Sequence, residues 1–238
     1  MPEAQIDEVL TELLDVRCPG ALNIYDEGAC VTVGDAPGKA TARLAALSRY
    51  LAGHWHARIA LIGEAPGKNG ARISGVPFAS MRTLTGSGAG EQSATIVQRT
   101  LIELGVDEEV VLWNASMLFP PENRDPAVGE LRACRRLLEM VTDGRTVYAI
   151  GRHAQEATGA PYLRHPANGG GAAFRAGVQA IFQSPPGADI AGLLRSLETR
   201  MGPKRPRPSM RSGRRTKPAT CRRCHLQLPV TGQCDFCS

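Results

Sequence analysis

The sequence predicts an α/β fold in which a mostly parallel, four-stranded central sheet lies between two layers of helices, α/β/α. Three short apolar runs have the length of buried strands: residues 59–62, 110–113 and 147–150. Segments with helical spacing, over residues 92–104 and 127–141, lie between them. Strands that alternate with helices form βαβ units, whose strands are parallel. A length of 238 residues suffices for one such domain and a small appendage.

The remaining elements are expected from local signals. Residues 1–57 look helical with interruptions, and a helix over residues 40–51 places three leucines on one face: Leu44, Leu47 and Leu51. Thr142-Asp143-Gly144 is a stop signal for the helix before it. Residues 162–164 and 178–182 are weaker strand candidates.

The composition is typical of a soluble globular protein. No run of about eighteen apolar residues is present, so we expect no membrane span and no membrane partner. The first eight residues are acidic and lack the basic-then-apolar order of a signal peptide. We therefore expect a cytoplasmic protein, and we expect it to be a monomer.

Charge divides the chain into parts. Residues 200–238 carry a net charge of +9, whereas residues 1–199 carry −4. The sequence predicts a folded domain over residues 1–199, a basic Pro/Arg-rich linker over 200–219 and a small metal-bound module over 220–238. A basic tail favours a polyanion such as nucleic acid through counterion release. The alternative is a solvated extension without a fixed partner.

Four of the seven cysteines lie in this tail, as two C-x-x-C pairs nine residues apart: Cys221 with Cys224, and Cys234 with Cys237. Two such pairs can close a tetrahedral Cys₄ site, so we predict structural zinc in a zinc-ribbon-like module. So small a module has too little core to fold without metal. Arg222 and Arg223 are expected to grip DNA phosphates. The alternative is a terminal cysteine cluster with a redox role or none.

Three polar or glycine-rich stretches follow predicted strands: Gly63 to Gly67, Asn114 and His165. In an open parallel sheet, ligands bind beyond the carboxyl ends of the strands, where these stretches should gather. Glycine lets a backbone approach a ligand closely, the Asn114 amide can pair with an imide edge, and His165 can donate to an oxyanion. Taken singly, each has a plain alternative as a loop, a turn former or a surface histidine.

Four segments resemble the motifs of the uracil-DNA glycosylase superfamily, and of its family 4 most closely. In chain order they are Gly63-Glu64-Ala65-Pro66-Gly67, Gly75-Val76-Pro77-Phe78, Asn114 with Pro120-Pro121-Glu122-Asn123-Arg124-Asp125-Pro126, and His165-Pro166-Ala167. The resemblance covers roughly residues 55–185.

The resemblance implies a role for each motif. Phe78 stacks on a flipped base, Asn114 reads its imide edge, and His165 stabilises O2 of the leaving uracil. The substrate pocket floor comes from one loop: Gly63, Ala65, Pro66 and Gly67. His165 and Glu64 are the expected catalytic residues, with either Glu64 or the backbone alone left to position water. The loop after the histidine contacts the DNA groove, through Pro166, Ala167, Asn168 and Gly169.

The chain departs from family 4 in three ways. Leu118 stands where the family has a cluster cysteine, and Cys18, Cys30 and Cys134 are scattered, so we expect no iron-sulfur cluster. Ala65 stands where family 1 enzymes place a water-activating Asp. The stretch after His165 is unusually rich in glycine.

The resemblance implies hydrolysis of the N-glycosidic bond of uracil, or of a related deaminated base, in DNA. The base must leave the stack before its C1′ atom is accessible. No organic cofactor is expected. The alternative, which Ala65 keeps open, is a weak or inactive member that acts as a damaged-DNA or partner-binding module.

Overall fold

The computed structural model describes residues 2–201. By its internal contacts the chain divides into two compact units, Met1–Tyr162 and Leu163–Ser238. The expected linker and the expected zinc module lie outside the described residues, apart from the first two positions of the linker. In residues 2–201 no helix is long and apolar enough to cross a membrane.

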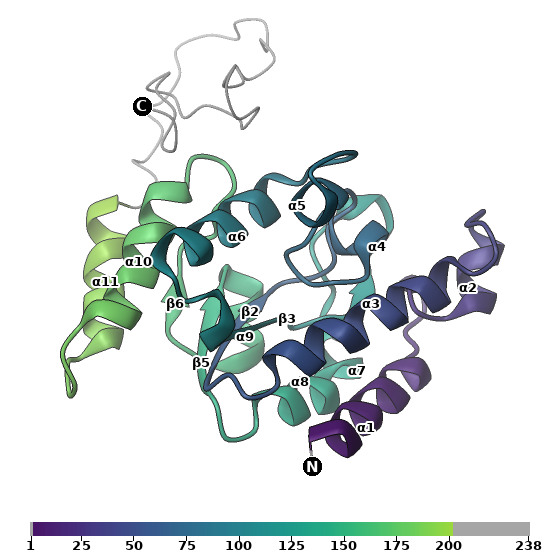
Figure 1. Ribbon diagram of the computed structural model, residues 1–238, viewed down its shortest axis with the longest axis horizontal. Coiled ribbons are helices and arrows are strands. Elements are labelled where there is room, and N and C mark those ends of the chain that lie inside the picture. Colours follow the sequence, from purple (N-terminus) through teal and green to yellow (C-terminus); the bar gives the residue numbers. More distant parts are fainter. Residues whose placement is uncertain (1, 202–238) are drawn as a thin grey trace, which may run out of the picture. The chain divides into compact units, whose positions relative to one another are not determined.

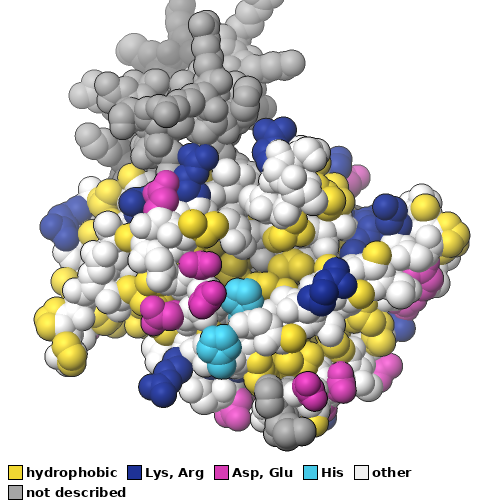
Figure 2. All heavy atoms as spheres, viewed as in Figure 1, with side chains coloured by type: hydrophobic (Ala, Val, Ile, Leu, Met, Phe, Trp, Pro, Cys, Tyr) yellow, Lys and Arg dark blue, Asp and Glu magenta, His cyan; other side chains and the backbone are white. Residues whose placement is uncertain are grey.

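Acidic and basic side chains are interspersed on the face that Figure 2 shows.

The central sheet has four strands in the order β3-β2-β5-β6. Their bounds are β2 Ile59–Gly63, β3 Val110–Asn114, β5 Thr146–Ile150 and β6 Tyr162–Leu163. Strand β2 pairs in parallel with both β3 and β5, which confirms the expected parallel sheet. Strands β2 and β3 are apolar along almost their whole length because both of their faces are covered.

Helices cover both faces of the sheet in the first unit. Helices α1 (Pro2–Asp15), α3 (Lys39–His54) and α8 (Arg135–Thr142) lie on one side, and α6 (Gln92–Leu104) lies on the other (Figure 1). The α3 side holds a continuous core to which Leu47, Ile62 and Trp113 contribute. The expected stripe on α3 is confirmed, with Leu47 and Leu51 fully buried and Leu44 partly buried.

The helix expected over residues 127–141 is divided in two. Helix α7 (Val128–Ala133) is capped by Cys134, and α8 begins at Arg135. Cys134 is buried, and its Sγ atom accepts a hydrogen bond from the backbone N–H of Met117 at 3.3 Å. This tertiary contact lies at the break, and no local propensity in the sequence reports it.

Shorter elements complete the first unit: β1 Leu22–Asn23, α2 Glu27–Thr32, α4 Ala71–Ser74, α5 Met81–Thr85, η1 Asp107–Glu109, β4 Leu118–Phe119, η2 Pro121–Asn123 and α9 Arg152–Thr158. Strands β1 and β4 form a separate antiparallel pair.

A buried ion-pair cluster fixes α4 against the N-terminal helices. Arg43 of α3 is 5% exposed and lies 2.8 Å from Asp35, which also pairs with Arg72 of α4 at 2.9 Å. Hydrogen bonds from Arg72 and Arg43 lower the pKa of Asp35 to about 2 against the opposing effect of burial. The Tyr25 hydroxyl donates to the carbonyl of Gly75 at 2.7 Å. These contacts set the start of the Gly75-to-Phe78 segment.

The described part of the second unit holds two helices, α10 (Gly171–Gln183) and α11 (Ile190–Met201), packed on each other. The weak strand prediction for residues 178–182 is wrong, because these residues belong to α10. The buried residues of α10 recur at helical spacing, at Phe174, Gly177 and Val178. A Cβ on Gly177 would lie 2.5 Å from a methyl group of Leu163, so this packing requires glycine.

Candidate active site

The carboxyl ends of β2 and β3 lie side by side. Gly63 and Asn114 are register partners, so the last residue of each strand faces the other. The pairing continues one step into the loops, where the N–H of Ala115 donates to Gly63 at 2.8 Å and that of Ser116 to Glu64 at 3.0 Å. The loops that follow β2 and β3 are therefore joined by backbone hydrogen bonds.

Three predicted substrate-binding residues meet at this edge. A Cβ atom on Gly63 would lie 2.6 Å from Oδ1 of Asn114 and 2.6 Å from Cε2 of Phe78. The Phe78 ring and the Asn114 amide thus approach the same backbone atom, and only glycine leaves room for both. Sequence reasoning placed these residues in one pocket, and the structure brings them together.

Phe78 has an unusual backbone. Its φ of 51° lies in the left-handed region, which a bulky aromatic residue rarely adopts. The conformation is held by its surroundings, since its carbonyl accepts a hydrogen bond from Nε2 of Gln98 on α6 at 3.3 Å. Residues kept in such regions cluster at ligand-binding and active sites.

The Asn114 amide has unused hydrogen-bonding capacity. Asn114 is 2% exposed, and within residues 2–201 its side chain makes no hydrogen bond. The amide N and O atoms are not among the fully enclosed, unpaired side-chain atoms of these residues, so they remain open to a molecule that enters beside them. A buried amide that lies beside an aromatic ring and is left unpaired is arranged for a polar ligand.

The Glu64 carboxylate contacts the start of α9. Its Oε1 accepts the backbone N–H of His153 at 3.2 Å, and its carboxylate fills the space beside Gly151, where a Cβ would clash with it. Burial is the main cause that raises the pKa of Glu64. The carboxylate therefore binds the first turn of α9, where helix N–H groups favour negative charge.

The loop after Glu64 is braced from a distant segment. The backbone N–H of Lys68 donates to Oδ1 of Asn123 at 2.8 Å, and Asn123 itself has a φ of 58°. Arg124 forms a bidentate pair with Glu130, which is 1% exposed. Pro66 is buried, whereas Ala65 and Gly67 are half-buried. The Pro120-to-Pro126 motif thus acts as a support for the loop.

Glu91 is a residue that sequence reasoning missed. It precedes α6, yet its side chain makes no capping bond. A Cβ on Gly67 would lie 2.6 Å from both Cδ and Oε1 of Glu91, and one on Gly70 would overlap the carboxyl group. Burial raises the pKa of Glu91 to about 7. An acid before a helix is ordinary in sequence, so no signal marked it.

His165 lies in the second unit, in a compact turn. The backbone N–H of Ala167 donates to its Nδ1 at 3.3 Å, so the ring proton of the neutral form is on Nε2. Burial, with a smaller effect from the Arg164 charge, lowers the pKa of His165 to about 4. At neutral pH the ring is thus an uncharged Nε2–H donor.

The turn after His165 requires glycine at two positions, Gly169 and Gly170. Asn168 and Gly169 are exposed and both have positive φ, 55° and 77°. A Cβ on Gly170 would clash with the carbonyl of His165. Pro166 is buried and Ala167 half-buried. Of the four residues of this turn that were predicted to contact DNA, only Asn168 and Gly169 are exposed.

The three body cysteines are free thiols, Cys30 and Cys134 buried and Cys18 half-buried. Within the described residues, no group of three or more His, Cys, Asp or Glu could hold a metal ion. The four tail cysteines, Arg222 and Arg223 lie beyond residue 201, so the zinc site stays a prediction.

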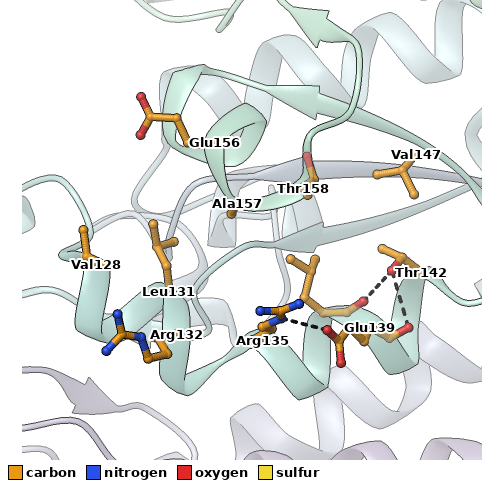
Figure 3. A pocket seen from close by; sticks show the side chains of 11 residues that line it. Val128, Leu131, Arg132, Arg135, Glu139, Thr142, Val147, Glu156, Ala157 and Thr158 are labelled. Atoms are coloured by element: carbon orange, nitrogen blue, oxygen red, sulfur yellow. Dashed lines mark hydrogen bonds and ion pairs between the residues drawn. The ribbon is translucent and has the colours of Figure 1, made fainter.

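A separate hollow of the first unit lies among α7, α8, α9 and β5 (Figure 3). Its lining mixes apolar side chains with both charge signs, and Arg135 pairs with Glu139 at 2.8 Å. None of the predicted site residues lines it. It offers no chemistry that bears on the loops above.

Comparison with known proteins identifies the family. Residues 51–217 match the family model described as the uracil DNA glycosylase superfamily. No curated protein matches the chain. Among solved structures, wild-type SMUG2 of Pedobacter heparinus is similar at 14% identity and a TM-score of 0.42, over 75% of this chain and 82% of that one.

Proposed function

Because this chain belongs to the uracil-DNA glycosylase superfamily, we propose that it excises uracil, or a related deaminated base, from DNA, with family 4 as its nearest branch. The observation that carries the proposal is the buried, unpaired Asn114 amide beside the Phe78 ring. An amide offers one donor and one acceptor, as does the imide edge of uracil. An aromatic face beside it suits a flipped base.

The proposed roles of Phe78, Asn114 and Gly63 are supported by this geometry, and that of His165 by the resemblance of its motif. Phe78 stacks on the base, Asn114 pairs with its N3–H and O4, and Gly63 leaves the backbone close to the base. His165, as a neutral Nε2–H donor, hydrogen-bonds O2. Its lowered pKa supports a donor that does not change charge above about pH 5. DNA phosphates are contacted by the turn after His165 and by the basic tail.

The reaction is a hydrolysis. The C1′–N1 bond breaks, its electron pair leaves on the uracil ring, and positive charge develops on the sugar. The His165 N–H stabilises the charge that grows on O2, and such preorganised donors commonly contribute more to the rate than any other single effect. Water then adds its oxygen to C1′ and gives up a proton, and the uracil anion finally takes up a proton, which leaves an abasic site and free uracil.

The test is an excision assay on single- and double-stranded oligonucleotides that contain uracil, hypoxanthine or xanthine. Release of uracil with cleavage at the resulting abasic site supports the proposal. Binding to these DNAs without release of any base supports the second candidate, a damaged-DNA-binding module. That candidate is favoured by one observation, the absence of an acid at Ala65.

Glu64, the second catalytic residue expected from sequence, is tested by Glu64→Gln. The glutamine carbonyl can still accept the N–H of His153, so we expect the rate constant for excision to fall less than about tenfold. Single-turnover excision with enzyme in excess measures it, and thermal unfolding controls for folding. A loss of about 10²-fold or more in a stable variant would instead make Glu64 the group that activates water.

The tail is tested by deletion of residues 202–238. Removal of this basic segment should weaken DNA binding and flatten the slope of log affinity against log salt by about 0.9 per lost phosphate contact on duplex DNA. Metal analysis should find about one zinc per full-length chain and none after truncation. An identical salt slope would show that the tail does not contact DNA. Iron that remains after truncation would contradict our expectation of no cluster.

A further inference from the structure

We propose that Glu91 is the general base of the reaction and accepts the proton of the attacking water. The inference rests on the proposed function and names a residue outside the four motifs. It starts from the position of the Glu91 carboxyl group, which lies against the backbone of the loop that leaves β2 at the candidate site.

The loop is shaped around this carboxyl group. Gly67 and Gly70 both face it, and a Cβ atom on either would collide with it. The same loop begins at Gly63, whose backbone contacts the Phe78 ring and the Asn114 amide. Helix α6 connects Glu91 with the Phe78 segment. It begins directly after Glu91, and Nε2 of its Gln98 donates a hydrogen bond to the Phe78 carbonyl. Glu91 is thus built into the wall that carries the base-binding residues.

No partner neutralises Glu91 in the part of the chain that the structure describes. The charged groups on α4, α5, α6 and the loop after Gly67 are Lys68, Arg72, Arg82, Arg99 and Glu103. Arg72 pairs with Asp35, and Arg82 donates a hydrogen bond to a backbone carbonyl at 3.3 Å. Arg72, Arg82 and Lys68 form no hydrogen bond with the Glu91 carboxyl group. A half-buried carboxyl group without a partner is costly, and such groups cluster at functional sites.

Glu64 is held at another contact, so the role of general base falls to a different residue. Its carboxylate is held by the N–H of His153 at the start of α9, whereas the Glu91 carboxylate is free to accept a proton. In the proposed step, water loses H⁺ to Glu91 while its oxygen bonds to C1′, and the C1′–N1 electron pair stays with the uracil anion. The pKa of about 7 matches a base that works at neutral pH.

The experiment measures the single-turnover rate of uracil release against pH in the full-length protein and in Glu91→Gln. We expect the wild-type rate to rise with pH and level off near pH 7. The Gln variant should lose about 10²-fold at pH 8 and lose this rise, with DNA affinity retained. Glu91→Asp should keep the rise at a lower rate. Glu108→Gln, which removes one exposed negative charge on η1, is the matched control.

Stability gives a readout independent of activity. The folded pKa of Glu91 is raised above its unfolded value, so its contribution to stability is full below about pH 4.5 and is lost as pH rises through 7. Glu91→Gln should therefore melt at a higher temperature than the wild type at pH 8, but not at pH 4.5. A purely structural carboxylate would give the opposite result at pH 8.

The outcomes separate the two proposals. If the wild type releases no base from any substrate, the proposed function falls and the role of Glu91 falls with it. If the wild type is active and Glu91→Gln keeps both its rate and its pH profile, only the role of Glu91 is overturned. A lower rate with an unchanged rise towards pH 7 also overturns it, because another group would then titrate.

Discussion

Asn114→Asp is expected to lower single-turnover excision of uracil by about 10³-fold or more, and Asn114→Ala by about 5- to 150-fold. Removing the amide leaves the base edge unpaired, which costs about 1–3 kcal/mol. A carboxylate costs more, because it presents only acceptors to the O4 acceptor of uracil and sits where the side chain is 2% exposed.

A folding defect would imitate this loss, so thermal unfolding and DNA affinity are measured beside the rate. Asn123→Asp is a matched control, since it makes the same change in an amide that contacts the loop backbone and not the base pocket. It should lose less activity than Asn114→Asp. Equal rates for wild type and both Asn114 variants would remove Asn114 from base recognition.

His165→Ala is expected to lower the rate of base release by about 10²- to 10³-fold, because one preorganised donor to an oxyanion is lost. Binding of uracil-containing DNA should change far less, since the donor acts mainly on charge that develops as the bond breaks. The measurement is single-turnover excision beside a binding titration on the same oligonucleotide.

The pKa of about 4 adds a pH expectation for His165. The folded value lies below the unfolded one, so the neutral ring favours the folded state above about pH 6.5, and that contribution is lost as pH falls through 4. Wild-type excision should show no change from His165 titration above pH 5. A loss confined to DNA binding in His165→Ala would mark the ring as a structural part of the turn.

The sheet was predictable because its strands are apolar runs with clear ends. Strand β3 covers residues 110–114 where the sequence suggests 110–113, and α6 has the expected bounds of 92–104. The break at Cys134 and the helix over residues 178–182 were not predictable. The break lies where Cys134 accepts a hydrogen bond from the Met117 N–H. The helix includes Gly177, which packs against Leu163. Both come from residues far apart in the sequence.

The candidate site was predictable where function restricts residue type. Gly63, Phe78 and Asn114 were grouped from sequence, and their side chains and backbone do meet. The environment of each acid was not predictable. Glu64 and Glu91 are the same residue type in the sequence. In the structure Glu64 binds the first turn of α9, whereas Glu91 has no partner in the described residues. Only the fold distinguishes a helix-binding carboxylate from an unpaired one.

The bond from Lys68 to Asn123 has a consequence for reading natural variation. Two segments some fifty-five positions apart share one hydrogen bond, and Asn123 makes it from a left-handed backbone that few residues tolerate. A substitution at Asn123 would therefore look like a loss of catalysis in a genetic screen, although this residue acts on the loop and not on the base. Such alleles should be rescued by changes that stiffen the loop, whereas alleles at Asn114 should not.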